Sequence, residues 1–321
     1  MSSPVEPSRR PRLLATSAGT NLEAFGTVEW GLLSAIALIW GSSFLLMEIG
    51  LRSLEPAVIT LARIGFGALG LALVPRARRT HIAREDLPRV ALLGLIWMAV
   101  PLSLFPIAQQ WIDSSVAGMI NAAMPLTTAA WATVLLGRAP GRRQLNGLLL
   151  GFTGIVAVSL PELPGIAGMG TPQTALGAGL VVLAVALYGL AANLAVPLQQ
   201  RYGALPVLLR AQLFALVLVV PLGVWALPGS RFAWGPVLAM VPLGVLGTGL
   251  AFVLMATLVG RVGGPRGTVA IYFVPVVAIV LGATLLQERV HPLALLGTAL
   301  VVIGAWATSR REGGATPPAH P

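Results

Sequence analysis

One arginine stands inside an apolar stretch that otherwise has no charge. Arg63 lies about two turns into residues 56–75. Insertion scales put the cost of an arginine at the centre of a membrane helix at roughly 2.5 to 3.5 kcal/mol, so such a residue usually faces a cavity or a partner. Arg63 therefore predicts either a site where the guanidinium binds a carboxylate through two hydrogen bonds, or an internal pair with Glu48 or a helix-end carbonyl.

Neutral polar residues and prolines share helix faces. Asn121, Pro125 and Thr128 are spaced as i, i+4 and i+7, which places them on one face of a helix. Tyr272 and Pro275 form a matching stripe later in the chain. A proline inside a helix frees a carbonyl group and kinks the helix. We expect these stripes either to line a cavity or to form packing contacts by hydrogen-bonding across helices.

Further candidates for substrate contact or gating lie in two other apolar stretches. Trp40 and Tyr188 each precede a glycine at the same stage of their stretch, and their ring faces can stack on a substrate. Ser43 and Asn193 add neutral polar groups. Glu48 is the best placed of the few acidic residues near apolar stretches, which makes it the candidate for coupling transport to protons.

The sequence contains no group of residues that is typical of a catalytic site. The three histidines, His81, His291 and His320, lie in expected loops or in the C-terminal tail. The sequence has no HExxH helix, no serine–histidine pair, no GxxxxGK phosphate loop, no lysine and no cysteine. We therefore expect no enzyme, no cofactor, no metal site and no ATP-driven step.

The amino-acid composition indicates that the helices that position these residues lie in a lipid bilayer. Hydrophobic residues make up 56% of the chain and charged residues 10%, against about 25% in an ordinary soluble domain, and the mean hydropathy is +0.85. Apolar runs of about 20 residues span a bilayer as helices. The sequence therefore predicts an all-α membrane protein with ten transmembrane helices. The predicted spans are residues 29–50, 56–75, 88–109, 115–136, 143–160, 175–197, 205–227, 235–258, 267–287 and 292–309.

The distribution of arginine predicts the orientation of these spans. All 21 basic residues are arginines, and with a cytoplasmic N-terminus only Arg52, Arg231 and Arg289 fall in outside loops. By the positive-inside rule, both termini are then cytoplasmic. Arg210 lies close to the cytoplasmic end of its span and is expected to snorkel to the interface. The net charge of +10 predicts contact with anionic lipid headgroups and not with nucleic acid.

The chain also aligns with itself at a shift of 150 residues. The segment AGMINAAMPLTTAAWATVLLG from Ala117 matches GTVAIYFVPVVAIVLGATLLQ from Gly267 without a gap, and Pro125 falls on Pro275. Five spans in each half give the second half the opposite orientation in the membrane, which is an architecture of secondary transporters. The predicted domains are a flexible tail (1–27), a first five-helix repeat (28–160), an outside linker (161–174), a second repeat (175–309) and a second tail (310–321).

Glycines follow the same repeat. Gly147 aligns with Gly297 and Gly154 with Gly304, and Gly151 adds to the small-residue face. Such faces allow helices to pack closely. We expect the fifth and tenth spans at the periphery, where they either brace each half or form the contact of a homodimer.

These segments resemble a known family. WGSSFLLMEIG from Trp40, EPAVITLARIGFGAL around Arg63 and YFVPVVAIVLGATLLQERVHPLALLGTALVVIGAW around Pro275 are similar to the EamA-type, ten-helix branch of the drug/metabolite transporter superfamily, over about residues 28 to 309. The resemblance implies a multi-pass carrier of the bacterial inner membrane that exports amino acids, other small metabolites or drugs. Two departures leave the substrate and the coupling ion open: the family often has a glutamate where Arg138 stands and a lysine where Glu48 stands.

Three functional hypotheses follow. The first is export of a small organic metabolite such as an amino acid by alternating access, with Arg63 binding the carboxylate. The second is drug or multidrug efflux, which predicts aromatic and apolar contacts with lipophilic cations. The third is a non-transporting membrane enzyme or scaffold, and the absence of catalytic motifs in the sequence argues against it.

Overall fold

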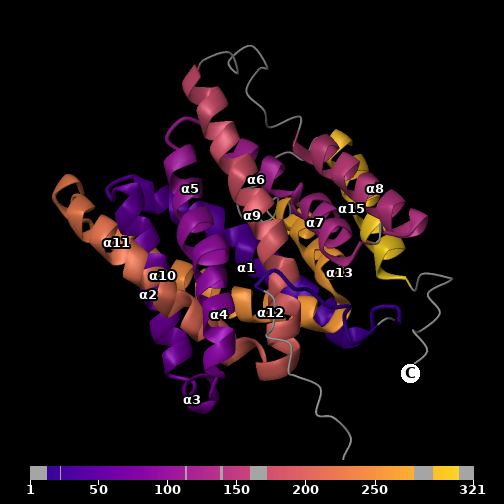
Figure 1. The fold of residues 1–321 in the computed structure, drawn as a ribbon. Helices are drawn as coiled ribbons and strands as arrows, with labels where there is room; N and C mark the ends of the chain where they lie inside the picture. The colour runs from indigo at the N-terminus through magenta and orange to yellow at the C-terminus, as the bar shows by residue number, and fades with distance from the viewer. Residues whose placement is uncertain are drawn as a thin grey trace, which may run out of the picture.

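The computed structural model describes residues 13–21, 23–112, 114–137, 140–159, 172–277 and 292–310, and every regular element in these ranges is a helix (Figure 1). The expectation of an all-α protein is confirmed. In chain order the elements are α1 (Thr27–Leu51), α2 (Pro56–Ala72), α3 (Pro75–Arg79), η1 (Arg84–Asp86), α4 (Leu87–Leu93), η2 (Gly94–Ala99), α5 (Val100–Ala108), α6 (Ser114–Asn121), α7 (Met124–Leu136), α8 (Arg142–Ser159), α9 (Pro172–Tyr202), α10 (Ala204–Ala226), η5 (Leu227–Gly229), α11 (Trp234–Gly244), η6 (Val245–Leu250), α12 (Ala251–Val262), α13 (Gly264–Gly267), η7 (Thr268–Tyr272) and α15 (Pro292–Ser309). Of these, η2 and η6 are π-helical, and η1, η5 and η7 are 3₁₀-helical.

Several of these helices suit a bilayer. In the described ranges, five are long and apolar enough to cross a membrane: Thr27–Leu51, Arg84–Ala108, Pro172–Tyr202, Ala204–Gly229 and Trp234–Val262. Shorter apolar helices are Pro56–Ala72, Met124–Leu136 and Leu295–Ser309. Large apolar side chains cover their outer faces, with Trp225 83% and Val217 71% exposed. Lipid is the solvent that such faces fit, while ten spans and the orientation of the termini stay predictions.

Two long helices contain a π segment at matching positions of the N-terminal and C-terminal halves of the chain. Gly94 begins η2, and Gly244, which lies 150 positions later, directly precedes η6. η2 packs against α10, η6 packs against α2, and α2 and α10 pack against each other. A π turn holds one residue more than an α turn, and such turns are frequent at functional sites. Each half therefore presents its π segment to a helix of the other half.

The two repeat-related prolines lie next to interruptions of the helix. α6 ends at Asn121 and α7 begins at Met124, so Pro125 occupies the first turn of a new helix, where a missing N–H costs little. Pro275 lies in the α-helical residues 273–277, which directly follow the 3₁₀ segment η7. The sequence predicted kinks at these prolines. The structure instead ends one helical segment and starts another just before each of them.

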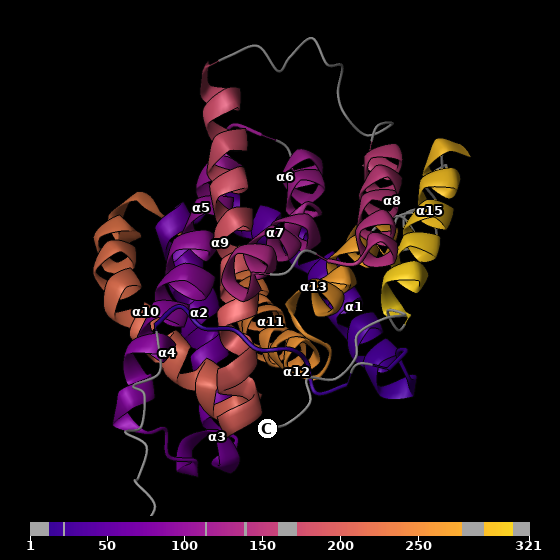
Figure 2. The ribbon, with the colours of Figure 1, turned by 45° about the vertical axis from the view of Figure 1, so that its right-hand side comes forward.

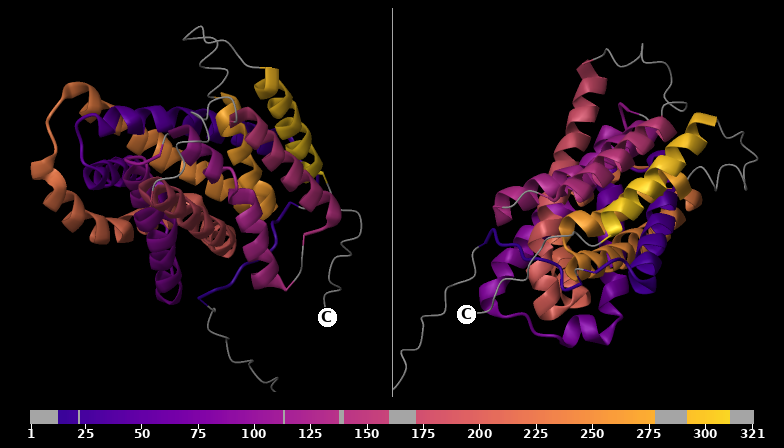
Figure 3. Two further views of the ribbon diagram at one scale, coloured as in Figure 1. Left: turned by 90° about the horizontal axis from the view of Figure 1, so that it is seen from above. Right: turned by 90° about the vertical axis from the view of Figure 1, so that its right-hand side faces the viewer.

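The predicted glycine faces meet each other within one chain. α8 and α15 pack side by side at the edge of the bundle, as Figures 2 and 3 show. A Cβ atom on Gly304 would lie 2.5 Å from the backbone nitrogen of Gly151 and 2.6 Å from the carbonyl oxygen of Gly147. These glycines allow backbone-to-backbone contact. The fifth and tenth predicted spans are peripheral, as expected, and their glycines join the two halves to each other.

Replacing Gly304 by alanine is expected to lower the melting temperature of the protein in detergent. The added methyl group has only backbone atoms as neighbours, which cannot turn aside, and overpacking of this kind costs about 1–3 kcal/mol. Gly179→Ala in α9 is the control, because a Cβ there meets nothing within 4 Å. Alanine favours helices over glycine by about 1 kcal/mol, so the control should be neutral or stabilising. Equal melting temperatures for the two variants would contradict this account.

The described part of the N-terminal tail lies against the bundle. The Thr16 hydroxyl donates a hydrogen bond to the carbonyl of Asn193 in α9 (2.8 Å). The backbone N–H of Asn21 donates to the carbonyl of Arg261 in α12 (2.6 Å). Polar atoms of this part of the tail therefore have partners on helices of the C-terminal half, and the flexibility of the tail stays a prediction.

Candidate functional site

A cavity lies between helices of both halves. Its wall includes five residues that the sequence predicted as candidates: Trp40, Ser43, Arg63, Asn121 and Tyr188. The rest of the wall is apolar and comprises Met47, Trp97, Leu102, Phe105, Met124, Phe252 and Ile271. The cavity volume is about 60 Å³. This space therefore combines one cation and a few neutral polar groups with an aromatic surface.

Among the described residues of the cavity wall, Arg63 is the only charged one. α2 begins at Pro56, whose fixed φ favours the first helical turn, and this start places Arg63 inside the bundle, where it is 6% exposed. Its Nε donates to Oγ1 of Thr248 (3.2 Å), and its Nη1 lies 3.8 Å from Sδ of Met47. Among the described residues no carboxylate forms an ion pair with it. Its positive charge is therefore available to a solute in the cavity.

Phe252 is the centre of the aromatic part of the wall. Its ring centroid lies 5.2 Å from that of Trp40, 5.7 Å from Trp97 and 6.4 Å from Tyr188, all in edge-to-face geometry. Tyr188 stacks on Phe105 at 5.9 Å. Such pairs stabilise one another beyond simple burial. The cavity thus has an aromatic side, and no aspartate or glutamate is found among the described residues of its wall.

Three of these aromatic residues were not among the sequence-based candidates: Trp97, Phe105 and Phe252. One signal for Trp97 was present, because tryptophan in membrane proteins concentrates near the interfaces and Trp97 stands far from both ends of its predicted span. The two phenylalanines carry no such signal, since phenylalanine is common in any apolar core.

Several buried amides in the described ranges have an unsatisfied oxygen, and Asn121 is the one among them that lines the cavity wall. It is the last residue of α6, it is 8% exposed, and its Oδ1 has no hydrogen-bond partner. A buried polar atom without a partner costs about 1–3 kcal/mol. A group that carries this cost in a cavity wall points to a role in binding.

Three other predicted residues lie outside the cavity wall and act as contacts between helices. Nδ2 of Asn193 donates to the carbonyls of Thr128 and Gly189, both at 2.9 Å. The hydroxyl of Tyr272 donates to the carbonyl of Leu148 in α8 (2.7 Å). For Asn193 and Tyr272 the structure therefore shows the packing role that was the alternative to substrate contact. The hydroxyl of Thr128 donates within its own helix, to the carbonyl of Met124 (2.7 Å).

Leucine at the two asparagine positions is expected to change stability in opposite directions. Asn121→Leu removes an unsatisfied oxygen and should leave the melting temperature equal or higher, while it lowers transport. Asn193→Leu removes two buried hydrogen bonds to backbone carbonyl groups, one of which joins α9 to α7, and should lower stability by about 1–3 kcal/mol. Thermal unfolding of both variants in detergent tests this. A loss of stability for Asn121→Leu as large as for Asn193→Leu would contradict the distinction.

Glu48 lies away from the cavity. Ser43 and Met47, at i and i+4, line the cavity wall, so the next residue points about 100° away around the helix. The Glu48 side chain is 55% exposed, and its Oε1 lies 3.9 Å from Nη2 of Arg52. The internal pair of Glu48 with Arg63, considered from the sequence, is not formed. The candidate for proton coupling thus has no contact with the predicted substrate site.

Arg210 has the structural role that its position suggested. Its Nη1 donates to the carbonyl of Ala77 and its Nη2 to that of Thr80, both at 2.8 Å. These carbonyls lie at the C-terminal end of α3, where backbone acceptors lack partners within the helix. Arg210 therefore fixes α3 against α10 and does not reach the cavity wall.

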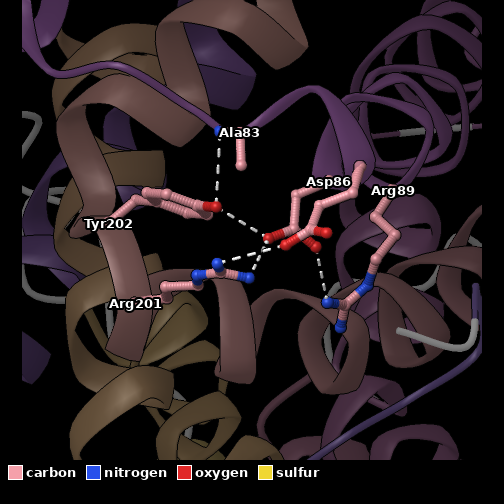
Figure 4. A network of polar contacts seen from close by, with 6 residues as sticks. Ala83, Asp86, Arg89, Arg201 and Tyr202 are labelled. Carbon is pink, nitrogen blue, oxygen red and sulfur yellow. Dashed lines mark hydrogen bonds and ion pairs between the residues drawn. The ribbon is translucent and has the colours of Figure 1, made fainter. Parts of the chain in front are cut away.

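A buried carboxylate outside the cavity joins the two halves of the chain (Figure 4). Asp86 is fully buried at the end of η1. Its Oδ1 accepts from Nη1 of Arg89 (3.0 Å), and its Oδ2 accepts from Nη1 of Arg201 and from the hydroxyl of Tyr202, both at 2.8 Å. Arg201 also pairs with Glu85 at 3.2 Å. These contacts therefore hold η1, which precedes α4, against the C-terminal end of α9. In the sequence Asp86 stands in an ordinary loop, and no pattern there predicted this contact.

Long apolar helices around an inner cavity with one buried cation in its described wall are compatible with a membrane transporter. The comparison with protein families agrees. The chain belongs to the EamA-like transporter family, whose model matches residues 29–160 and 175–310. The predictions of family membership, of a transporter and of a location in the bacterial inner membrane are confirmed.

Similar proteins include transporters from several organisms. A probable terminal-alkyne amino-acid exporter of Streptantibioticus cattleyicolor is 30% identical over 292 residues, which are 89% of this chain and 94% of that protein. The uncharacterized transporter YoaV of Bacillus subtilis is 24% identical, with 86% of this chain and 94% of that protein covered. The uncharacterized inner membrane transporter YedA of Escherichia coli K12 is 26% identical, with coverages of 85% and 88%. A crystal structure with a TM-score of 0.72 and 18% identity covers 88% of this chain and 98% of its own, and it shows that the fold is shared.

Proposed function

We propose that the chain is a secondary carrier that exports a small metabolite with a carboxylate group, such as an amino acid. The observation that carries this proposal is the buried guanidinium of Arg63 in the cavity wall, without a carboxylate partner in the described ranges. A charge in such surroundings is stabilised when a substrate supplies the opposite charge. The amino-acid exporter that is 30% identical to this chain supports the same substrate class.

The size and charge of the cavity favour this substrate over a lipophilic cation. A water molecule needs about 10–15 Å³ of such space, so about 60 Å³ suits a few waters or one small solute. The aromatic wall fits an apolar side chain as well as a drug. Arg63 distinguishes the two substrates, because it repels a cation and no acidic residue in the described part of the wall offsets its charge. Multidrug efflux is therefore the second candidate.

The transport cycle that we propose is alternating access by two inverted five-helix repeats, with ten spans and both termini in the cytoplasm. Three observations support the two repeats: two separate family matches, the paired π segments, and the packing of α2 against α10. In this orientation Met47 and Phe105, near the C-terminal ends of α1 and α5, lie on the outer side. The Asp86 contacts and the N-terminal segment lie on the cytoplasmic side.

Export can be tested before the substrate is identified. Cells that express the wild-type chain and cells with an empty vector are grown in parallel, and their media are compared by mass spectrometry. Accumulation of amino acids or other small carboxylates outside the expressing cells is the expected result. Protection against a lipophilic cationic drug, with no difference in extracellular carboxylates, would favour the efflux hypothesis instead.

A further inference from the structure

A hydroxyl group in η6 holds the guanidinium of Arg63. Thr248 is fully buried, and its Oγ1 accepts the hydrogen bond from Nε of Arg63 at 3.2 Å. The same Oγ1 donates to the carbonyl of Leu243, also at 3.2 Å. A hydroxyl group has one proton and two lone pairs. Because the proton is directed to Leu243, a lone pair is left to face Arg63, and the hydroxyl is fixed as an acceptor for the guanidinium.

The backbone around Thr248 is held from two other helices. Nε1 of Trp40 in α1 donates to the carbonyl of Gly247 at 2.8 Å. Nε2 of Gln212 in α10 donates to the carbonyl of Thr248 at 2.9 Å. Both carbonyls belong to the π segment, whose hydrogen bonding differs from that of a regular helix. Side chains from outside the helix therefore stabilise η6 in the geometry that presents Thr248 to Arg63.

α2 lies directly on this segment. Gly67 is one turn after Arg63 and shares its helix face. A Cβ atom on Gly67 would lie 3.1 Å from the carbonyl oxygen of Gly244 and 3.1 Å from the backbone nitrogen of Gly249. The face of α2 that presents Arg63 is thus in close contact with the backbone of η6.

We propose that Thr248 is a positioning residue for the anion site, so that the N-terminal half supplies the charge and the C-terminal half directs it. This inference rests on the proposed function, because it assigns a role at the same site. Its consequence for transport is that a movement of one half against the other separates Arg63 from Thr248. The guanidinium then loses its fixed direction, and the affinity for a carboxylate falls in the state that results.

The test uses the full chain in detergent and its tryptophan fluorescence, to which Trp40 and Trp97 in the cavity wall contribute beside six other tryptophans. Each of the twenty protein amino acids is titrated into the wild type, and the tightest ligand is compared with its amide, which has no carboxylate. Thr248→Val, of nearly the same shape, is expected to raise Kd for the amino acid about tenfold, since a hydrogen bond to a charged group is lost. Kd for the amide should not change. Thr248→Ser keeps the hydroxyl and should restore wild-type affinity.

Two results would overturn the inference while leaving the proposed function intact. In the first result, Thr248→Val binds the amino acid with the wild-type Kd, although Arg63→Gln no longer binds it. The other is an equal shift for the amino acid and its amide in both threonine variants, which indicates a change of cavity shape. Thr248→Ala replaces the valine variant if that protein does not fold. If the wild type binds none of the amino acids, or Arg63→Gln binds as the wild type does, the proposed function fails and the inference fails with it.

Discussion

Arg63→Gln is expected to reduce transport of a carboxylate substrate at least thirty-fold without unfolding the protein. Removing one partner of a buried charge pair costs about 2–5 kcal/mol, and every 1.4 kcal/mol is a factor of ten. Stability should stay the same or rise, because Arg63 is 6% exposed and forms no ion pair with the described residues. Its removal therefore leaves no carboxylate of the protein unpaired.

Proteoliposomes with the purified protein provide the measurement, with initial rates of amino-acid uptake at several concentrations. Arg52→Gln is the matched control, since this arginine has a side chain that is 67% exposed and lies outside the cavity wall. The control should transport as the wild type does. Wild-type rates and affinity for Arg63→Gln would exclude the proposed role of the guanidinium. A large loss of thermal stability in that variant would mean that Arg63 has a structural partner.

Asp86→Ala is expected to cause the largest loss of stability among the substitutions considered. Asp86 is fully buried, and the side chain of Arg89, its partner at 3.0 Å, is only 9% exposed. Breaking a buried ion pair by removing one partner costs about 3–5 kcal/mol, because the remaining charge is buried without compensation. Tyr202 and Arg201 lose an acceptor as well. Thermal unfolding in detergent and the yield of folded protein measure the effect.

Glu85→Ala serves as the control for this prediction. Glu85 is adjacent in sequence and pairs with the same Arg201, but both side chains are about half exposed, at 53% and 52%. Exposed ion pairs contribute about 0–1 kcal/mol. A small change for Glu85→Ala beside a large change for Asp86→Ala is the expected pattern. Equal effects would show that burial of the carboxylate does not determine the strength of this contact.

Much of the architecture could be predicted because lipid imposes strict rules on a sequence. Apolar length predicted the helices, since backbone groups in a membrane must be satisfied within the segment. The cost of a buried charge marked Arg63, and it lies in the cavity wall. The glycines of α8 and α15 were expected to form close contacts, and they do.

The other features depended on the direction in which each side chain points, which the spacing of residues in the sequence does not determine. Asn121 and Thr128 share a stripe in the sequence, yet the break between α6 and α7 separates them, so only Asn121 reaches the cavity wall. Glu48 directly follows Met47, but its side chain points to a different side of α1 and lies outside the cavity wall. Asp86 stands in a loop, and its burial arises from a contact with α9, more than a hundred residues later.

The π segments have a mechanical consequence. If a π turn moved along its helix by one residue, the residue that it passed would rotate by about 100° around the helix axis. Trp97 lies in η2 and Thr248 in η6. A step of one residue in either helix would thus turn an indole ring or a hydroxyl group out of its present contact while the helix axis stays in place. The chain has no cysteine of its own, so a single Trp97→Cys substitution, probed with a thiol reagent, would report such a rotation as a change in reactivity without background. Such a rotation would change which side chains face the cavity without a bend in either helix.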